Sequence, residues 1–196
     1  MAIRIIEVGP GDAEQPEGEL PEPVVHLVPM RRRHLRSVLR IEGQVYPRPW
    51  SLPLFMSELN MRNSRYYVVA RFEGSVVGYC GMMFTGDDAH VTTIAVDPSY
   101  QRQKIGTRLL LQGTQESLAR GCRHLTLEVR IGNVAAQTMY RQFGFKAAGV
   151  RKNYYAESNE DALVMWAEHI DTEEYAKRLD VIEAGVPGTT IVDAGQ

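Results

Sequence analysis

Apolar residues recur along the middle of the chain with two different periods. From 124 to 130 the segment HLTLEVR alternates between apolar and polar side chains, which is the pattern of a strand with one buried face. From 105 to 121 the segment IGTRLLLQGTQESLARG instead gathers its leucines on one side of a helix and ends at Gly121. The chain therefore mixes amphipathic helices with half-buried strands.

The same two periods predict the other elements. Strands are expected at 24–29, 89–96, 145–155 and 161–169, a hairpin at 66–84 that turns at 72–75, and helices at 30–46, 49–61, 133–144 and 171–184. The order of the central elements is β-α-α-β-β-β-α-β-α-β-β. This order predicts an α/β (α+β) fold with a mixed sheet and helices on both of its faces.

The two ends of the chain differ from this central pattern. Residues 1–23 carry six acidic side chains and four prolines, so we expect a disordered arm in which IRIIEV, at 3–8, can form a short strand. Residues 24–169 hold the alternating elements and form the expected domain. Residues 170–196 are expected to hold the helix at 171–184 and then an irregular tail, GVPGTTIVDAGQ.

Composition excludes several classes of partner. A formal net charge of −2 gives no overall attraction to nucleic acid or to an anionic membrane, and the basic run RRRHLR is typical of a solvated helix face. We find no apolar run of about 18 residues and no signal-peptide pattern, and we expect a cytoplasmic protein. Cys80 and Cys122 are expected to be small buried residues. The histidines lack the spacing of ligands, so no metal is assigned.

A basic turn separates the strand at 89–96 from the helix that begins near 105. The segment reads DPSYQRQKIGTRLL, with Arg102, Lys104 and Arg108 around the start of the helix. The first amides of a helix lack partners within it, and the helix dipole adds positive charge there, so such a turn can bind phosphate. Gly106 would allow the phosphate close to the backbone. A solvated connector without a ligand is the alternative interpretation.

The segment IAVDPSYQRQKIGTRLL resembles the acyl-CoA loop of the GCN5-related N-acetyltransferase (GNAT) family, whose pattern is Gln/Arg-x-x-Gly-x-Gly/Ala. Gln101 and Gly106 match the pattern, and Lys104 stands in place of the first glycine. The segment at 133–145 resembles the family's fourth-helix motif, N-x-x-A-x-x-x-Y-x-x-x-G-F. The resemblance covers about residues 24–169 and implies the GNAT fold, a splayed and mostly antiparallel mixed sheet.

The resemblance also implies acetyl-CoA as the co-substrate. Its pantetheine arm is expected along the strand that precedes the turn, and its pyrophosphate at the turn itself. The residues implied are Ile94, Ala95, Val96, Gln101, Arg102, Gln103, Lys104, Ile105, Gly106, Thr107 and Asn133. Lysine donates an amide as glycine does, unless the position needs a positive φ. At Lys104 we therefore expect weakened or altered cofactor contact rather than its loss.

Within the family the likeness is to RimI-type bacterial enzymes, which acetylate the N-terminal alanine of a small-subunit ribosomal protein. The stretches that carry it are PRPWS, LEVRIGNVAAQTMY, RKNYY and EDALVM. The likeness implies an enzyme acting on a protein N-terminus, with a ribosomal protein as a candidate partner. It further implies that Trp50, Tyr154 and Tyr155 border the peptide groove. The alternatives are a buried tryptophan that anchors a turn and two ordinary strand tyrosines.

Acyl transfer from a thioester to an amine needs a base near the amine and an acid near the departing thiolate. A peptide α-amine has a pKa of about 8, so a modest base suffices. Glu128 lies on the polar face of its strand and, by the resemblance, matches the general base; a solvated carboxylate paired with Arg130 is the alternative. Tyr140 matches the general acid, although its residue type alone predicts a core aromatic. Tyr154 or Tyr155 is the substitute acid.

Two rival functions stay open at this point. The same scaffold can acetylate a lysine side chain or a small-molecule amine instead of an N-terminus. A non-catalytic module that binds acyl-CoA or another protein is favoured by Lys104 and by the two tails. The presence of both Glu128 and Tyr140 argues against such a module, because a protein without the activity has no need to keep both.

Overall fold

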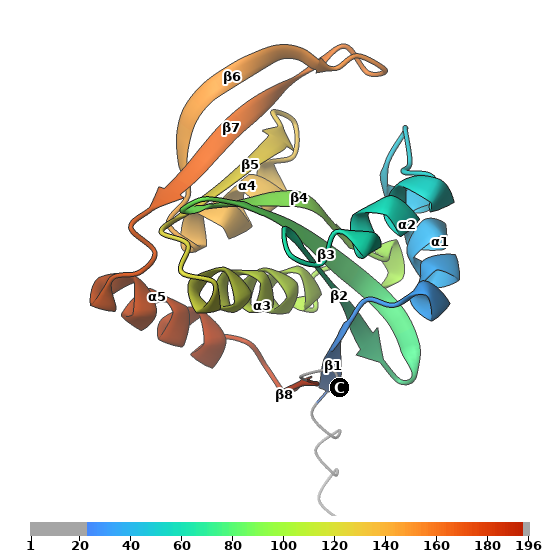
Figure 1. Cartoon of the computed structure of the whole chain (residues 1–196), viewed down its shortest axis with the longest axis horizontal. Helices are drawn as coiled ribbons and strands as arrows, with labels where there is room; N and C mark the ends of the chain where they lie inside the picture. Colours follow the sequence, from blue (N-terminus) through green and yellow to red (C-terminus); the bar gives the residue numbers. More distant parts are fainter. Residues whose placement is uncertain (1–22, 194–196) are drawn as a thin grey trace, which may run out of the picture.

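The computed structural model describes residues 23–193. Within that range eight strands form one sheet in the order β6-β7-β5-β4-β3-β2-β1-β8 (Figure 1). The strands are β1 (Val24–Pro29), β2 (Arg65–Phe72), β3 (Ser75–Thr85), β4 (Asp88–Val96), β5 (His124–Arg130), β6 (Lys146–Tyr155), β7 (Glu160–Glu168) and β8 (Thr189–Val192). The helices are α1 (Leu35–Val45), α2 (Leu52–Asn60), α3 (Ile105–Ala119), α4 (Val134–Gln142) and α5 (Glu173–Ala184), with 3₁₀ turns η1 (Arg32–His34) and η2 (Pro98–Tyr100). The strand expected at 3–8 lies outside the described residues.

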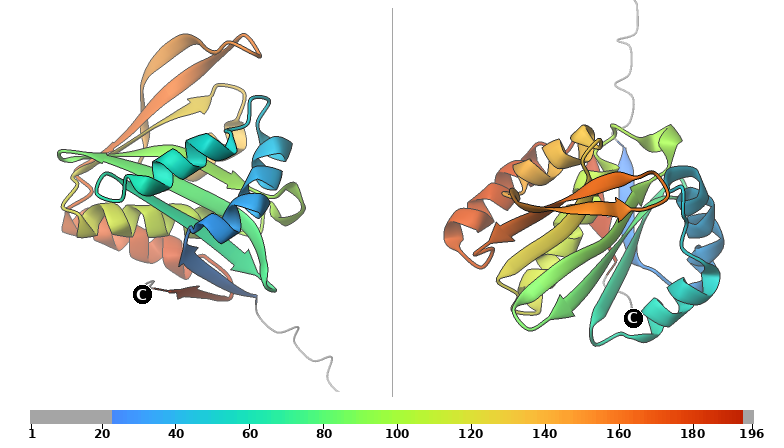
Figure 2. Two further views of the ribbon diagram at one scale, coloured as in Figure 1. Left: turned by 45° about the vertical axis from the view of Figure 1, so that its right-hand side comes forward. Right: turned by 90° about the horizontal axis from the view of Figure 1, so that it is seen from above.

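The sheet is mixed, as predicted. Most neighbouring strands are antiparallel, and two pairs, β4–β5 and β1–β8, are parallel. The helices cover both faces: α1 and α2 lie on one side, and α3, α4 and α5 on the other (Figure 2). The predicted fold class is therefore confirmed, and the order of the elements from β1 to β7 is the predicted one.

Two hydrophobic cores hold these layers together. In β2, Val68 and Ala70 pack with α3, while Tyr67 and Val69 point to the opposite face and pack with α1 and α2. Successive side chains of a strand point to opposite faces of the sheet, so a strand buried on both faces carries a continuous apolar run. The sequence YYVVA of this strand has that character.

The C-terminal tail is a correction to the sequence interpretation. The helix expected at 171–184 is present as α5, but the tail expected to be irregular contains β8, which pairs in parallel with β1. The sequence predicted that Arg108 adds positive charge beside the basic turn between β4 and α3. It is instead almost fully buried, and its guanidinium donates to the Thr190 hydroxyl and to the Pro187 carbonyl. The tail thus pairs both terminal nitrogens of a buried guanidinium, whose Nε has no partner among the described residues.

Two smaller predictions can also be checked. The hairpin between β2 and β3 turns at Glu73 and Gly74, whose φ angles of 48° and 79° suit a two-residue turn. Cys80 and Cys122 are both buried and unpaired, as predicted. In the part of the chain that the structure describes, no helix is long and apolar enough to cross a membrane.

Candidate functional site

The sheet opens between β4 and β5. Within residues 23–193 these two strands pair only where Asp88, Ala89 and His90 face His124, Leu125 and Thr126. Beyond that point β4 stays paired with β3, while β5 continues with β7, so β5, β6 and β7 rise away from the rest of the sheet (Figure 1). Beyond His90 the edge of β4 that faces β5 has no strand partner among the described residues. Ile94, Ala95 and Val96 lie along this edge, and the Ile94 carbonyl accepts from the Tyr46 hydroxyl. A ligand can use the backbone groups of this edge as a further strand would.

Glu128 lies in this opening, two positions beyond the last residue of β5 that pairs with β4. Its side chain is only 10% exposed, and each carboxylate oxygen has a basic partner. Oε2 lies 3.1 Å from His90 Nε2, and Oε1 lies 3.2 Å from an Arg151 guanidinium nitrogen. The alternative pairing with Arg130 is wrong, since Arg130 binds Glu157 at 2.7 Å and Glu160 at 3.0 Å.

His90 is a site residue that sequence reasoning missed. Its Nδ1 lies 2.6 Å from the Thr126 hydroxyl, so the ring bridges Thr126 and Glu128 on the neighbouring strand. Burial lowers the pKa of His90; the Glu128 carboxylate opposes this shift, and Arg151 adds to it. His90 could have been identified only from the parallel pairing of β4 with β5, which places it beside Thr126 and Glu128. The register of that pairing is a tertiary property that spacing does not reveal.

Tyr140 enters the same region from α4. Its ring is buried and contacts Phe145, with 5.8 Å between the ring centres, so the expected core packing is present. Burial raises the pKa of Tyr140 well above its ordinary value, and the nearby Tyr46, Cys80 and Tyr155 raise it further. Among the described residues its hydroxyl has no hydrogen-bond partner. A neutral phenol in such a position keeps its proton available for a bound group.

Tyr46 is a second tyrosine of this region that the sequence interpretation did not single out. It lies at the C-terminus of α1, and its hydroxyl donates to the Ile94 carbonyl at 2.7 Å. Burial raises its pKa to about 12. The bond ties α1 to the strand expected to hold the pantetheine arm, and it occupies one carbonyl of that strand.

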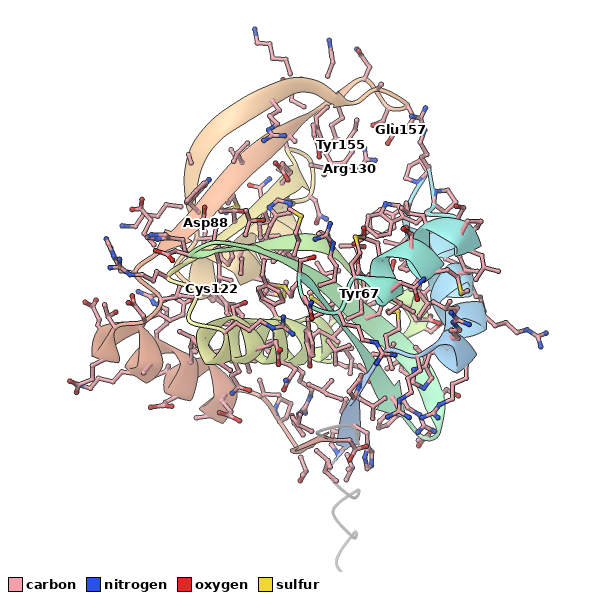
Figure 3. The ribbon with its side chains drawn as sticks, viewed as in Figure 1. Tyr67, Asp88, Cys122, Arg130, Tyr155 and Glu157 are labelled. Carbon is pink, nitrogen blue, oxygen red and sulfur yellow. The ribbon has the colours of Figure 1, made fainter. Side chains whose placement is uncertain are left out.

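Tyr154 and Tyr155 end β6 at the rim of the opening. Their rings meet edge to face with 5.1 Å between centres, and each has an arginine nearby. The Arg130 guanidinium lies 3.8 Å from the Tyr155 ring centre, and that of Arg151 lies 5.6 Å from the Tyr154 ring centre. Figure 3 shows Arg130, Tyr155 and Glu157 close together near the turn between β6 and β7. Burial raises the pKa of both tyrosines, that of Tyr155 to about 12, and Tyr154 is the more exposed of the two, at 47%.

Trp50 lies on the other side, in the segment between α1 and α2. Its ring packs against Phe55, with 5.3 Å between the ring centres. Trp50 therefore anchors the turn between α1 and α2, which is the alternative interpretation given above. Its backbone N–H donates to Glu42 Oε1 at 2.9 Å. Glu42 is only 1% exposed, and burial raises its pKa to about 7. Sequence reasoning missed Glu42 because a glutamate on a basic helix is expected to face solvent.

The basic turn between β4 and α3 has a strained backbone. Asp97 accepts from Ser99 N at 3.0 Å and from Arg40 at 2.6 Å, which fixes the end of the strand. Arg102 and Lys104 then take φ angles of 62° and 60°, in the left-handed region that favours glycine. We expected altered cofactor contact if position 104 needs a positive φ, and Lys104 has one. Residues 101–104 are exposed.

The start of α3 offers backbone donors to that turn. By helix geometry the amides of Ile105, Gly106 and Thr107 lack carbonyl partners within α3. At Gly106 a Cβ would lie 3.3 Å from Met139 Sδ, so glycine permits the close approach of α4. Asn133 caps α4, with its Oδ1 accepting from Ala136 N at 3.1 Å, and the side chain is exposed. Within residues 23–193 no three His, Cys, Asp or Glu side chains gather as metal ligands would.

Comparison with known proteins agrees with this geometry. The sequence model of the acetyltransferase (GNAT) family matches residues 35–145. A putative ribosomal protein bS18-alanine N-acetyltransferase of Bacillus subtilis is 38% identical over 137 residues, which cover 70% of this chain and 91% of the relative. The ribosomal protein bS18-alanine N-acetyltransferase of Escherichia coli K12 is 35% identical over 133 residues, covering 67% of this chain and 88% of the relative.

The solved structures give the same result for the fold. The crystal structure of the ribosomal-protein-S18-alanine N-acetyltransferase from Escherichia coli superposes with a TM-score of 0.68 at 32% identity, covering 74% of this chain and 94% of that one. The implied fold and the family resemblance are thus confirmed. The chain belongs to the acetyltransferase (GNAT) family and is an N-acetyltransferase similar to the RimI-type enzymes.

Proposed function

We propose that the protein transfers the acetyl group of acetyl-CoA to the N-terminal α-amine of a protein, with the alanine terminus of a ribosomal protein as its candidate substrate. The observation that carries the proposal is the position of Glu128, a shielded carboxylate inside the opening between β4 and β5. The relatives named above act on an alanine terminus, and enzymes of this family use acetyl-CoA.

In this proposal acetyl-CoA extends from the N-terminus of α3 along β4 into the opening. The free amides of Ile105, Gly106 and Thr107, with those around Lys104, bind the pyrophosphate at the positive end of the α3 dipole. The open edge of β4 at residues 94–96 receives the amide groups of the pantetheine arm. The side chains of Gln101, Arg102 and Gln103 border the phosphates from the exposed turn, and Asn133 borders the arm from the start of α4.

Glu128 acts as the general base on the incoming amine. His90 and Arg151 hold its two oxygens, so the carboxylate is oriented before substrate binds. An α-amine with a pKa of about 8 is partly protonated at neutral pH, and a carboxylate in reach can accept its proton, directly or through a water. The neutral amine then attacks the thioester carbonyl, and the new C–N bond forms as the C–S bond breaks.

Tyr140 acts as the general acid. The departing thiolate needs one proton, and the raised pKa of Tyr140 means that its phenol carries that proton throughout the neutral range. Its hydroxyl is not engaged with another described residue, so it can donate to the sulfur. The attacking nitrogen loses a second proton as the amide forms, and this proton balances the one that restores the Tyr140 phenol. Glu128 releases the first proton to solvent, so each transfer to an ammonium group releases one proton overall.

The acceptor peptide enters from the rim formed by Tyr154 and Tyr155 on one side and by the segment of Trp50 on the other. Arg130 and Arg151 stack on the two tyrosines and hold the rim in place. Trp50 contributes a wall that is itself anchored by Phe55 and Glu42.

Acetyl transfer to a short peptide beginning Ala-Arg tests the proposal, read by mass spectrometry. The control is the same peptide with a blocked N-terminus and a free lysine. We expect acetylation of the free terminus and none of the lysine. Faster transfer to the lysine peptide or to a polyamine would replace the N-terminal assignment by a side-chain or small-amine one. Absence of transfer to every acceptor, with acetyl-CoA bound, would leave a binding module.

A further inference from the structure

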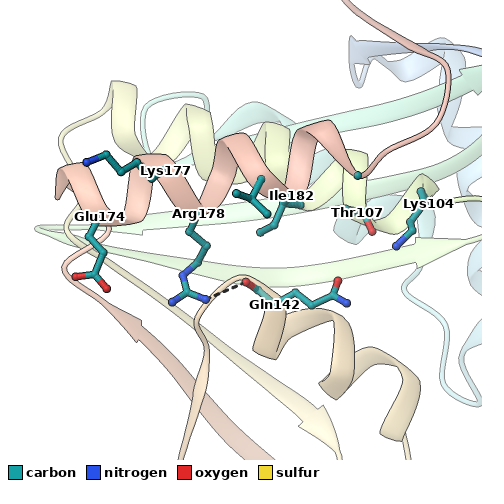
Figure 4. Close-up of a pocket in the computed structure, with 9 residues that line it drawn as sticks. Lys104, Thr107, Gln142, Glu174, Lys177, Arg178 and Ile182 are labelled. Atoms are coloured by element: carbon teal, nitrogen blue, oxygen red, sulfur yellow. Dashed lines mark hydrogen bonds between the residues drawn. The ribbon is translucent and has the colours of Figure 1, made fainter.

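A cavity of about 620 Å³ lies beside the phosphate turn, between α3, α4 and α5. Figure 4 shows Lys104 and Thr107 at one end, Gln142 in the middle, and Arg178 and Glu174 toward the other end. The transfer step described above does not use this cavity. Its volume falls in the range of small-molecule sites, about 300 to 1,000 Å³.

We propose that this cavity binds the 3′-phosphorylated adenosine end of acyl-CoA, and that α5 supplies a phosphate-binding arginine, Arg178, to it. The inference rests on the proposed function, since it concerns the other end of the same co-substrate. It adds a ligand contact from a helix that lies outside residues 35–145, the part of the chain that the family shares.

The cavity is continuous with the turn. Lys104 and Thr107 belong both to the lining of the cavity and to the start of α3, where the pyrophosphate is placed. A nucleotide whose pyrophosphate lies on these amides therefore has its adenosine at the mouth of the cavity. Figure 4 shows the side chains of Lys104 and Arg178 reaching toward the end of α4 from opposite sides.

Arg178 is in position before any ligand arrives. One of its guanidinium nitrogens donates to the Gln142 carbonyl at 3.3 Å, and its side chain lies over Gly144, where a Cβ would come within 3.4 Å of Nε. The Tyr175 hydroxyl donates to the Phe143 carbonyl at 2.9 Å, which fixes α5 against α4. An arginine held in this way loses little freedom when its remaining N–H groups bind a phosphate.

The lining combines charge with an apolar surface, as a nucleotide requires. Lys104, Lys177 and Arg178 outnumber the single acidic lining residue, Glu174, and Lys177 is paired with Glu173 at 2.8 Å. Val181 also lines the cavity and is 73% exposed, so its side chain is accessible to a ligand. Together with Ile182 it offers an apolar platform for a purine ring.

The experiment compares the binding of CoA with that of dephospho-CoA, which lacks only the 3′-phosphate, by isothermal titration calorimetry. We expect the protein to bind CoA about tenfold more tightly than dephospho-CoA, the size of one charge-assisted contact. Arg178→Gln should remove most of that difference by weakening CoA alone, and Arg178→Lys should restore part of it. Arg36→Gln, an equal loss of charge on the exposed surface of α1, is the matched control and should change neither affinity.

The outcomes separate the inference from the proposed function. Tight CoA binding with no preference over dephospho-CoA, or a preference that survives Arg178→Gln, would overturn the inference and leave the transferase assignment intact. Equal weakening of both ligands by Arg178→Gln would also overturn it, because α5 would then only support the fold of the turn. Failure of the unaltered protein to bind either ligand would overturn both proposals. Thermal unfolding of each variant shows whether a loss of binding is a loss of folding.

Discussion

The candidate transfer site around Glu128 and the basic turn at 97–104 are organised in opposite ways, although the proposed function requires one co-substrate to reach both. Glu128 is 10% exposed and held by two basic groups, and the Tyr140 ring is packed in the core. Residues 101–104 of the turn are exposed, and two of them have positive φ angles.

The difference follows from what each region has to do. A group that moves a proton needs a fixed position and a shielded surrounding, where its electrostatic interactions are strong. A loop that binds a hydrated phosphate must be accessible to solvent. Such a loop binds through its backbone N–H groups, so its backbone conformation matters more than the packing of its side chains. Substitutions should therefore affect rate at the first region and affinity or backbone strain at the second.

The largest effect is expected at Glu128. Glu128→Gln keeps the shape and the oxygen acceptor but removes the base, so kcat should fall by about 10² to 10⁴ with the melting temperature nearly unchanged. Steady-state kinetics on the N-terminal peptide measures this. Glu168→Gln, on the exposed end of β7, is the matched loss of charge and should have normal kinetics. A Glu128→Gln variant with an unaltered rate would refute the base assignment.

Tyr140→Phe should separate chemistry from packing. Because the hydroxyl has no partner within the described residues, its removal should leave the free energy of unfolding almost unchanged while kcat falls by about 10-fold to 10²-fold. The contrasting variant is Tyr66→Phe, whose hydroxyl accepts from Gln112 Nε2 at 3.1 Å. That change should cost about 1 kcal/mol of stability and leave kcat unchanged. If Tyr140→Phe is fully active, Tyr154 and Tyr155 become the residues to test as the acid.

Glu42→Gln should change the dependence of stability on pH. Burial raises the pKa of Glu42 from 4.5 to about 7, so between these values the folded protein holds a proton that the unfolded chain has released. The resulting stability is complete below pH 4.5 and is lost as the pH rises through 7. Glutamine keeps an acceptor for the Trp50 N–H and does not ionise. The variant should therefore be more stable than the parent by about 3 kcal/mol at pH 8, and by less than about 1 kcal/mol at pH 5.

Chemical unfolding at the two pH values measures the effect of Glu42→Gln. A difference between variant and parent that is the same at both would mean that Glu42 does not titrate in this range. In that case the region around Trp50 would owe its order to packing against Phe55 rather than to a buried neutral carboxyl.

The smallest effect is expected at Lys104. Lys104→Gly relieves a left-handed backbone and should raise the free energy of unfolding by up to about 1 kcal/mol. Lys104→Gln keeps the strain but removes the charge, so the pair separates the two contributions. We expect CoA to bind more weakly to the glutamine variant than to the unaltered protein. The glycine variant should show a smaller loss of affinity, because glycine adopts a positive φ without strain. Equal stability of all three proteins would mean that the turn tolerates lysine without strain.

Local patterns in the sequence predicted much of the molecule. The alternation of HLTLEVR produces β5, the leucines of IGTRLLLQGTQESLA produce α3, and Asn133 caps α4 as its residue type predicted. These features depend on neighbours within a few positions, which a sequence displays directly. The order of the elements predicted the mixed sheet, and the family resemblance, carried by the motifs at 101–106 and 133–145, added its splayed form.

Other features depended on groups that are distant in the chain. The pairing of Glu128 with His90 and Arg151 joins three strands, and its form follows from the register of β4 against β5. The burial of Arg108 follows from the return of the C-terminal tail to the edge of β1, and the cavity beside Lys104 from the docking of α5 on α4. Apolar spacing shows which face of an element is buried but not which partner covers it.

By itself, then, the sequence of this protein predicted its elements and its family, both of which the structure and the relatives confirm, and it proposed Glu128 and Tyr140 as candidates for the transfer step. The tertiary structure alone decided the ion-pair partners of Glu128, the sign of φ at Lys104 and the docking of the C-terminal helix α5 beside the basic turn. The physical reason is that periodicity and capping are local, whereas ion pairs, burial of charge and cavities arise only where distant segments meet.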